Sequence, residues 1–202
     1  MDNLTRKNLL TNPIEQFALW FKEAKNSVPT DNPDSACLST INAEGFPDGR
    51  VILIKEFDDK GFVFYTNIES PKGTSLLENQ KASLTFHWDS LHKQIRVLGT
   101  AQLVSDKQAD AYFKSRPRES QLGAWASQQS SVLEARSILN QRFEELTEKF
   151  KGQEITRPPF WSGFRIKPAR IEFWQQRDNR LHDRFVFIKN QLQGWDIQRL
   201  YP

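Results

Sequence analysis

The sequence predicts a mainly β fold with flanking helices, arranged as an antiparallel barrel or sandwich. Five short runs of β-type residues follow one another closely, and the early linkers AEGFPDG and DDKG carry the glycine, proline and aspartate of tight turns. Short strands joined by tight turns favour antiparallel pairing over alternating βαβ units. Neither GxGxxG nor GxxxxGK[ST] occurs, so the phosphate loops of parallel nucleotide-binding sheets are absent from the sequence.

The predicted strands fall into two groups on either side of a helical middle. The first group comprises residues Ala36–Asn42, Arg50–Phe57, Phe62–Asn67, Ala82–Trp88 and Gln94–Val104. The second comprises Trp161–Ile166, Ile171–Gln176, Arg184–Ile188 and Trp195–Leu200. No repeat, low-complexity tract or shift in composition separates the groups, so residues 1–202 are expected to form a single domain.

Three helices are expected, at about residues 13–27, 105–115 and 132–150. Asn12 and Pro13 supply a cap and a first-turn proline for the first helix, and Ser105 with Gln108 forms a capping box for the second. The stretch RPRESQLGAWASQQSS between the second and third helices is broken by Pro117 and by glycine and serine. It is predicted to be a loop with at most one helical turn.

Charge is balanced and interspersed, with 28 basic and 25 acidic residues and a net charge of +3. A general nucleic-acid binder would show a concentrated basic face, so any anion recognition is expected to be local. No nucleic-acid partner is expected.

The sequence also indicates a compartment and excludes several kinds of site. Cys37 is the single cysteine, which rules out an intramolecular disulfide and agrees with a reducing compartment. No signal-peptide core and no run of about eighteen apolar residues occurs, so a cytoplasmic protein without a membrane partner is expected. Neither HExxH nor GxSxG is present, and His87, His92 and His182 lack metal-ligand spacing, so no metal is expected.

Basic and aromatic residues gather most densely in the segment RIEFWQQRDNRLHDRF, which suits a flat, anionic ligand. Residues that can bind a phosphate occur in three more places. These are Arg50 and Lys55 around the run VILI, Lys72, and the stretch containing Arg116, Arg118 and Ser120. Strand alternation puts Arg50 and Lys55 on opposite faces, where they could serve two different anions. The candidate stacking surfaces for a planar ring are Trp125, Trp161 and Trp174.

Taken together, these segments resemble the pyridoxine/pyridoxamine 5'-phosphate oxidase family. The resemblance spans Asn12 to Pro202, in the family's order and spacing, through RVILIK, FVFYTN followed by SPKG, KQIRVLG, AYFKSRPRESQLGAWASQQSS, PPFWSGFRI, RIEFWQ, NRLHDR and WDIQRLYP. It implies an FMN-binding split β-barrel, antiparallel and Greek-key-like, that forms a homodimer with FMN at two interface sites. It also implies oxidation of pyridoxamine and pyridoxine 5'-phosphates to pyridoxal 5'-phosphate, with oxygen reduced to hydrogen peroxide.

The resemblance carries over residue by residue to three sets of positions. The FMN site is implied at Arg50, Val51, Ile52, Leu53, Ile54, Lys55, Tyr65, Thr66, Lys72, Gln94, Gln129, Ser130, Trp174 and Arg184. The grip on the substrate phosphate is implied at Lys55, Tyr112, Arg116 and Ser120. Arg180 and His182 are implied as the catalytic residues, which also bind the substrate by lying over its pyridine ring opposite the flavin.

Two departures from the family pattern affect these expectations. Pro71 precedes Lys72 where many members have arginine, so one contact to the FMN phosphate is expected to be missing or to pass to Arg50. The N-terminal segment that can fold over the active site is short, and its role would fall to Arg6 or Lys7. Arg170 and Arg177 have no assigned role and are expected to be solvated.

Two other functions remain open from the sequence. One is a related flavin oxidase acting on another ring, such as a phenazine precursor. The other is a non-catalytic barrel that binds single-stranded nucleic acid through basic and aromatic residues.

Overall fold

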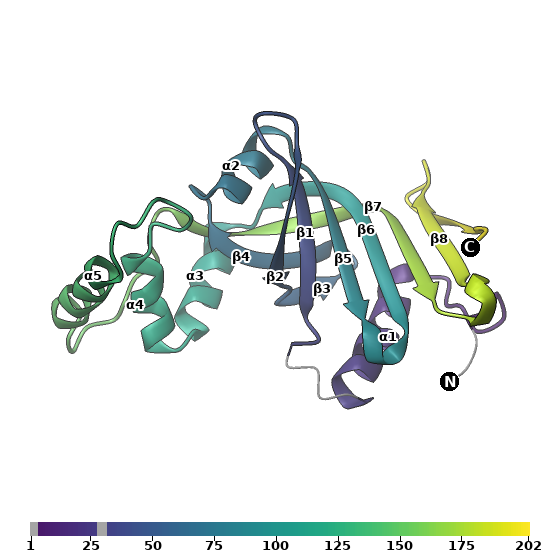
Figure 1. Ribbon diagram of the computed structural model, residues 1–202, viewed down its shortest axis with the longest axis horizontal. Coiled ribbons are helices and arrows are strands. Elements are labelled where there is room, and N and C mark those ends of the chain that lie inside the picture. The colour runs from purple at the N-terminus through teal and green to yellow at the C-terminus, as the bar shows by residue number, and fades with distance from the viewer. Residues whose placement is uncertain (1–3, 28–31) are drawn as a thin grey trace.

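The computed structural model describes residues 4–27 and 32–202. Over these residues, nine strands form one curled antiparallel sheet with helices around it, which confirms the predicted fold class (Figure 1). The strands are β1 Ser35–Ile41, β2 Pro47–Leu53, β3 Glu56–Asp58, β4 Gly61–Asn67, β5 Lys81–Trp88, β6 Lys93–Leu103, β7 Trp161–Gln175, β8 Asp183–Lys189 and β9 Trp195–Arg199. The helices are α1 Pro13–Ser27, α2 Pro71–Glu78, α3 Asp106–Ser115, α4 Arg118–Ala126 and α5 Arg136–Lys149, with short 3₁₀ turns at Asp89–Leu91 and Asp178–Arg180.

The sheet runs in the order β2-β1-β5-β6-β7-β4-β3, and the chain connects its two edge strands, β2 and β3, directly at a seam. β3 follows β2 directly in the chain, so the predicted strand Arg50–Phe57 is in fact two strands separated by Ile54 and Lys55. The Ile54 amide donates to the Asp34 carbonyl at the start of β1, and the Lys55 amide donates to the Val63 carbonyl of β4, at 2.9 and 2.8 Å. These two hydrogen bonds extend the β1–β2 and β3–β4 pairings to the seam between β2 and β3, and they fix the backbone of Lys55.

β7 is one long strand rather than the two that were predicted. One edge of β7 pairs with β6, while the other pairs first with β4 and then with β8, and β8 pairs in turn with β9. Pro168 interrupts the sequence pattern but lies opposite Gly99, where the register shifts between Leu98 and Gly99. A bulge tolerates the missing proline amide, and a Cβ on Gly99 would lie 2.1 Å from the Lys167 carbonyl oxygen.

The main hydrophobic core lies inside the curled sheet, and α1 packs against it. Asn12 caps this helix, since its Oδ1 accepts the Ile14 amide at 2.8 Å. Phe17 of α1 is fully buried and packs edge-on against Phe57 and Phe62 at centroid distances of 4.9 and 4.8 Å. Burying one such ring stabilises the fold by about 1.5–3 kcal/mol.

A second hydrophobic cluster holds the helical end of the molecule, on the side opposite β8 in Figure 1. It consists of Phe113, Leu122, Phe150, Ile155 and Trp161, with partly buried aromatics around them. It brings α3, α4 and the start of β7 together, with Phe150 joining at the end of α5.

The structure corrects the predictions for this helical end. The stretch Arg116–Ser131, predicted as a loop, contains the nine-residue helix α4, whose Leu122 and Ala126 are buried. The third predicted helix begins at Arg136 rather than at residue 132. α2 was not predicted, because SPKG carries a proline and a glycine. Pro71 takes the start of that helix, where its missing amide costs nothing.

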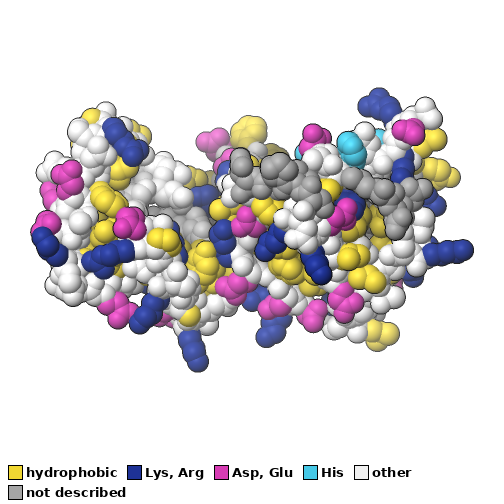
Figure 2. Space-filling model, turned by 90° about the horizontal axis from the view of Figure 1, so that it is seen from below, with side chains coloured by type: hydrophobic (Ala, Val, Ile, Leu, Met, Phe, Trp, Pro, Cys, Tyr) yellow, Lys and Arg dark blue, Asp and Glu magenta, His cyan; other side chains and the backbone are white. Residues whose placement is uncertain are grey.

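None of the helices in residues 4–27 and 32–202 has the length and apolar character needed to cross a membrane. The face shown in Figure 2 carries Lys and Arg side chains interspersed with Asp and Glu, without an extended basic surface.

Candidate functional site

A cavity of about 690 Å³ lies between the end of β2, β4, and the helices α2, α3 and α4. Its lining residues are Val51, Ile52, Leu53, Lys55, Tyr65, Thr66, Asn67, Lys72, Tyr112, Arg116, Pro117, Ser120, Gly123, Ala124, Ser127, Gln129 and Trp161. Among the described residues, the lining therefore contains three cationic side chains and no carboxylate. The cavity also brings together most of the residues predicted to bind FMN and all four residues predicted to bind the substrate phosphate.

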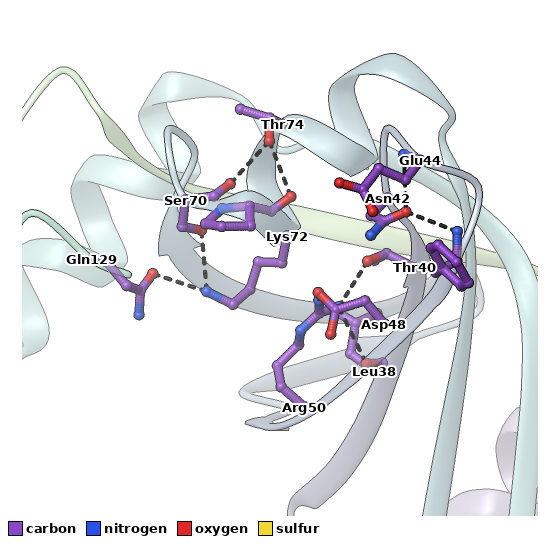
Figure 3. A network of polar contacts seen from close by, with 12 residues as sticks. Leu38, Thr40, Asn42, Glu44, Asp48, Arg50, Ser70, Lys72, Thr74 and Gln129 are labelled. Atoms are coloured by element: carbon purple, nitrogen blue, oxygen red, sulfur yellow. Dashed lines mark hydrogen bonds and ion pairs between the residues drawn. The ribbon is translucent and has the colours of Figure 1, made fainter. Parts of the chain in front are cut away.

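Lys72 forms one basic region of the cavity, at the N-terminal end of α2 (Figure 3). Its ammonium group donates to Ser70 Oγ and to Gln129 Oε1, both at 3.1 Å, and Thr66 also donates to Gln129 Oε1 at 3.0 Å. Burial lowers the pKa of Lys72, the positive charge of Arg50 lowers it further, and Asp48 opposes the shift. A buried ammonium with neutral partners, beside a helix N-terminus, is suited to an anion.

Arg50 lies beside this region without lining the cavity. Its guanidinium donates to Thr40 Oγ1 at 2.8 Å and also to the carboxylate of Asp48 (Figure 3). Its neighbours Val51 and Leu53 point the other way and are exposed along the cavity side of β2, as strand alternation predicts.

Arg116 forms a second basic region. Its guanidinium lies over the Trp161 ring at 5.0 Å, and its buried Nη1 has no hydrogen-bond partner among the described residues. Burial lowers the pKa of Arg116, while Tyr112 opposes the shift. An unpartnered buried donor costs about 1–3 kcal/mol, more when it is charged, and an anionic ligand would remove that cost.

Three aromatic rings form a parallel stack along the wall next to Arg116. Tyr65 stacks on Tyr112 with ring centroids 3.9 Å apart and on Trp161 at 5.4 Å. The Tyr65 hydroxyl donates to Glu56 Oε1 at 2.6 Å, and Gln108 donates to the other oxygen of the same carboxylate. Burial raises the pKa of the Tyr65 phenol, and the bond to Glu56 raises it further, so this hydroxyl stays protonated.

Lys55 is the third cation of the lining. Its ammonium group pairs with the carboxylate of Asp34 at 2.7 Å. Lys55 follows β2 at the seam of the sheet, so its backbone position is fixed by the fold.

The remaining predicted residues lie elsewhere. Gln94, Trp174, Arg180, His182 and Arg184 do not line this cavity. Gln94 pairs with Trp174, and Trp174 pairs with Arg184, across adjacent strands at the far end of β6, β7 and β8. In Figure 1, β8 and the helices α3 and α4 stand at opposite ends of the molecule. One chain therefore presents the predicted site as two separate halves.

This second half is organised around two buried carboxylates. Glu172 accepts from Arg184 at 2.7 Å and also pairs with Arg170 at 3.6 Å. Asp183 accepts from Arg177 at 2.6 Å. Arg170 and Arg177 were expected to be solvated. The side chain of Arg170 is 39% exposed, which agrees with this prediction, whereas Arg177 has a buried Nη2 and is held by Asp183, so the prediction was wrong for Arg177.

His182 has a defined hydrogen-bonding state in this half. Its ring lies 4.6 Å from that of Trp174, and its Nδ1 accepts the Arg177 amide at 3.1 Å. Because a backbone amide can only donate, the proton of a neutral His182 lies on Nε2.

Two predicted FMN residues and two predicted lid residues lie away from the cavity. Ser130 is exposed with φ +70°, and Ile54 is buried in the main core. Arg6 and Lys7 are exposed at the N-terminal end of the described chain.

Sequence reasoning missed several lining residues on α4 and its flanks. These are Pro117, Gly123, Ala124 and Ser127, and Asn67 at the end of β4 was missed as well. Ser120, Ala124 and Ser127 recur at helical spacing, so one face of a helix would have identified them had the stretch been predicted as helical.

Comparison with known proteins identifies the family. Residues 22–150 match the family described as pyridoxamine 5'-phosphate oxidase, and residues 161–202 match the pyridoxine 5'-phosphate oxidase C-terminal dimerisation region. The chain belongs to the pyridoxamine 5'-phosphate oxidase family. The resemblance drawn from the sequence is thereby confirmed.

Similar members of this oxidase family cover nearly the whole chain. Relatives from Brucella canis, Brucella suis and Brucella abortus, each named pyridoxine/pyridoxamine 5'-phosphate oxidase, are 50% identical over 191 residues, which is 94% of this chain and 94% of theirs. The crystal structure of PhzG from Burkholderia lata 383, in complex with tetrahydrophenazine-1-carboxylic acid, has a TM-score of 0.92 at 28% identity and covers 100% of this chain and 99% of that one. A related FMN-binding protein from Nostoc punctiforme has a TM-score of 0.76 at 15% identity, covers 96% of this chain and 100% of its own, and supports the fold alone. The split-barrel fold is confirmed.

The residues of this chain fit FMN, the cofactor that the resemblance implies. FMN has a flat ring system with a phosphate at the end of its side chain, and the cavity offers cations without a competing carboxylate among the described lining residues. The orphaned Nη1 of Arg116 offers an unmet donor to an anionic oxygen, and Lys72 offers a positive charge that its neutral partners do not offset.

Proposed function

We propose that this protein oxidises pyridoxamine 5'-phosphate and pyridoxine 5'-phosphate to pyridoxal 5'-phosphate, with FMN as cofactor and oxygen as the final acceptor, which yields hydrogen peroxide. The observation that carries the proposal is a cavity with two separate basic regions and, within residues 4–27 and 32–202, no lining carboxylate. Two phosphates, one on the cofactor and one on the substrate, would account for both regions. The 50% identity to relatives named for this activity supports the same choice.

The two regions divide the binding work. Lys72, with Gln129 and Thr66 beside it, is suited to the FMN phosphate at the start of α2. Arg50 lies close enough to lower the pKa of Lys72, so it can share that charge where Pro71 replaces the arginine of other members. Arg116 and Lys55, with the hydroxyls of Tyr112 and Ser120, would hold the substrate phosphate.

FMN, when bound, supplies the hydride-accepting chemistry of the reaction. The residues of the chain then bind and orient the substrate, since holding the reacting groups together can contribute about 7–11 kcal/mol to lowering a barrier. Tyr65 stays protonated, so its ring is a neutral wall of the cavity. The proton on Nε2 makes His182 a hydrogen-bond donor toward a substrate ring.

The two halves of the site would meet in a homodimer. The chain carries the family's C-terminal dimerisation region over residues 161–202, which contains Trp174, Arg180, His182 and Arg184. A two-fold interface would place these residues of one subunit over the cavity of the other and create two equivalent sites. This arrangement explains why Arg180 and His182 do not line the cavity of their own chain.

A second candidate is oxidation of another ring, as in phenazine-precursor chemistry. The high TM-score to PhzG from Burkholderia lata 383 favours it. The higher identity to the Brucella relatives, together with the joint presence of Lys55, Tyr112, Arg116 and Ser120, favours a phosphorylated substrate. A non-catalytic nucleic-acid-binding barrel finds no support in the interspersed charge of Figure 2.

The test is direct. The purified protein should show a flavin absorption band, and it should release peroxide when either phosphorylated substrate is added in air. Pyridoxamine without its phosphate should react with a much higher KM. Absence of both turnover and peroxide after FMN is supplied would refute the proposal, and turnover of phenazine precursors alone would favour the second candidate.

A further inference from the structure

The three cations of the cavity differ in how they are neutralised. Lys72 donates to a hydroxyl and an amide oxygen, and Arg116 has an unpartnered Nη1. Only Lys55, among the three cations lining the cavity in the described chain, makes an ion pair with a carboxylate, that of Asp34. No carboxylate lines the cavity in the part of the chain that the structure describes, so Asp34 is a neighbour that offsets one of the cavity's charges.

Asp34 is fixed by the fold, not held by Lys55 alone. Its carbonyl accepts the Ile54 amide at 2.9 Å, at the seam where β2 ends. Both side chains of the pair retain access to solvent, with 30% of Lys55 and 21% of Asp34 exposed. The pair is therefore accessible to an incoming ligand, while the backbone on both sides of it stays in place.

We propose that Asp34 sets the phosphate affinity of the cavity by competing with the substrate phosphate for the ammonium group of Lys55. This inference rests on the proposed function, in which Lys55 contacts that phosphate. It makes Asp34 a residue that determines affinity and selectivity without contacting the reacting atoms.

The physical reason is the short distance between the phosphate and the carboxylate of Asp34. An ammonium has three donors, so Lys55 can contact a phosphate oxygen while it keeps Asp34. The phosphate would then lie about 5 Å from a carboxylate, well inside the distance at which salt screens like charges. Either Asp34 gives up its partner or the phosphate meets a repelling charge, and both outcomes lower affinity for a dianion. A ligand without a phosphate would feel little of this effect.

Two substitutions of Asp34 distinguish competition with the phosphate from a role in positioning the side chain of Lys55. Asp34→Asn removes the charge but keeps an oxygen that can accept from Lys55, whereas Asp34→Ala removes both. Competition predicts that both variants lower the KM for pyridoxamine 5'-phosphate by about three- to tenfold, with the KM for unphosphorylated pyridoxamine unchanged. The control is Asp58→Asn, whose carboxylate pairs with Arg165 and does not border the cavity, and which should leave both constants unchanged.

A binding measurement keeps the test independent of turnover. Isothermal titration of the FMN-loaded protein with inorganic phosphate should show tighter binding to Asp34→Asn than to wild type by the same factor. If the wild type oxidises neither substrate, the proposed function fails, while the phosphate titration still decides the role of Asp34. A KM that rises in Asp34→Ala and stays constant in Asp34→Asn would show placement instead, and would overturn the proposal. Unchanged phosphate affinity in both variants would overturn it as well.

Discussion

The proposed division of the site between two subunits predicts that two inactive variants restore activity to each other. Arg116 lies in the cavity, whereas Arg180 is exposed beside β8 and does not line it. Replacing either with alanine removes one charged contact to a desolvated ligand, at a cost of about 2–5 kcal/mol. Each variant alone should therefore lose about 30-fold or more in kcat/KM.

The expected recovery follows from the two-fold geometry. In a heterodimer of Arg116→Ala with Arg180→Ala, one site combines both defects and the other combines the intact cavity with the intact β8 residues. Random association of equal amounts gives about half heterodimers, so the mixture should regain about a quarter of wild-type activity. Heterodimers isolated through two different tags should show about half.

The matched control reverses the outcome. A chain carrying both substitutions, paired with a wild-type chain, leaves neither site intact, because each site takes one half from each subunit. Peroxide release by tag-purified heterodimers measures both cases. If the mixed variants stay inactive while the wild-type and double-variant heterodimer keeps half of the activity, each site is built within one chain and the reasoning is refuted.

Three further predictions follow from single side chains. Lys72→Met should weaken FMN binding at least tenfold, measured by flavin fluorescence. The FMN-free variant should be as stable as wild type or up to about 1 kcal/mol more stable, because burial and Arg50 already disfavour the charge of Lys72. A large loss of stability would contradict this. Gly73→Ala should lower the free energy of unfolding by about 2–4 kcal/mol in a denaturant titration, because its Cβ would lie 2.3 Å from the Ile68 carbonyl oxygen. The control variant Gly123→Ala has open space around the added Cβ and should not destabilise the protein. The pKa of Tyr65 is raised above its unfolded value of 10.0, so its contribution to stability is fully present below pH 10 and is lost as the pH rises further. The free energy of unfolding of wild type should therefore fall more steeply above pH 10 than that of Tyr65→Phe. Parallel plots of unfolding free energy against pH would remove Tyr65 as the cause.

Local sequence patterns located most strands, because alternation and turn chemistry act over a few residues. They failed where a residue's usual effect was cancelled by its partner in space. Pro168 does not end β7, because Gly99 on the neighbouring strand allows a bulge there. Pro117 and Gly123 do not prevent α4, since the proline precedes its first turn and Leu122 is anchored in the second hydrophobic cluster.

The site shows the same division between local and spatial information. Segment motifs placed Lys55, Tyr65 and Arg116 at the cavity, but the ion pair of Lys55 with Asp34 joins residues 21 positions apart and leaves no local trace. Gln94 and Trp174 belong to the same resemblance yet lie outside the cavity. A linear sequence says which residues share a function and does not say which copy of the chain supplies them.

The cavity lies between two hydrophobic clusters that the chain builds separately. Ile52 packs against the cluster inside the curled sheet, whereas Tyr112 and Trp161 belong to the cluster under α3 and α4. A ligand bound in the cavity would contact both clusters and so link two parts of the chain whose hydrophobic cores are separate. The amides of α4 should therefore exchange their hydrogens sooner than those of β5 and β6 in the empty protein, and binding should bring the two rates together. A ligand in this cavity would therefore also make unfolding of the protein more cooperative.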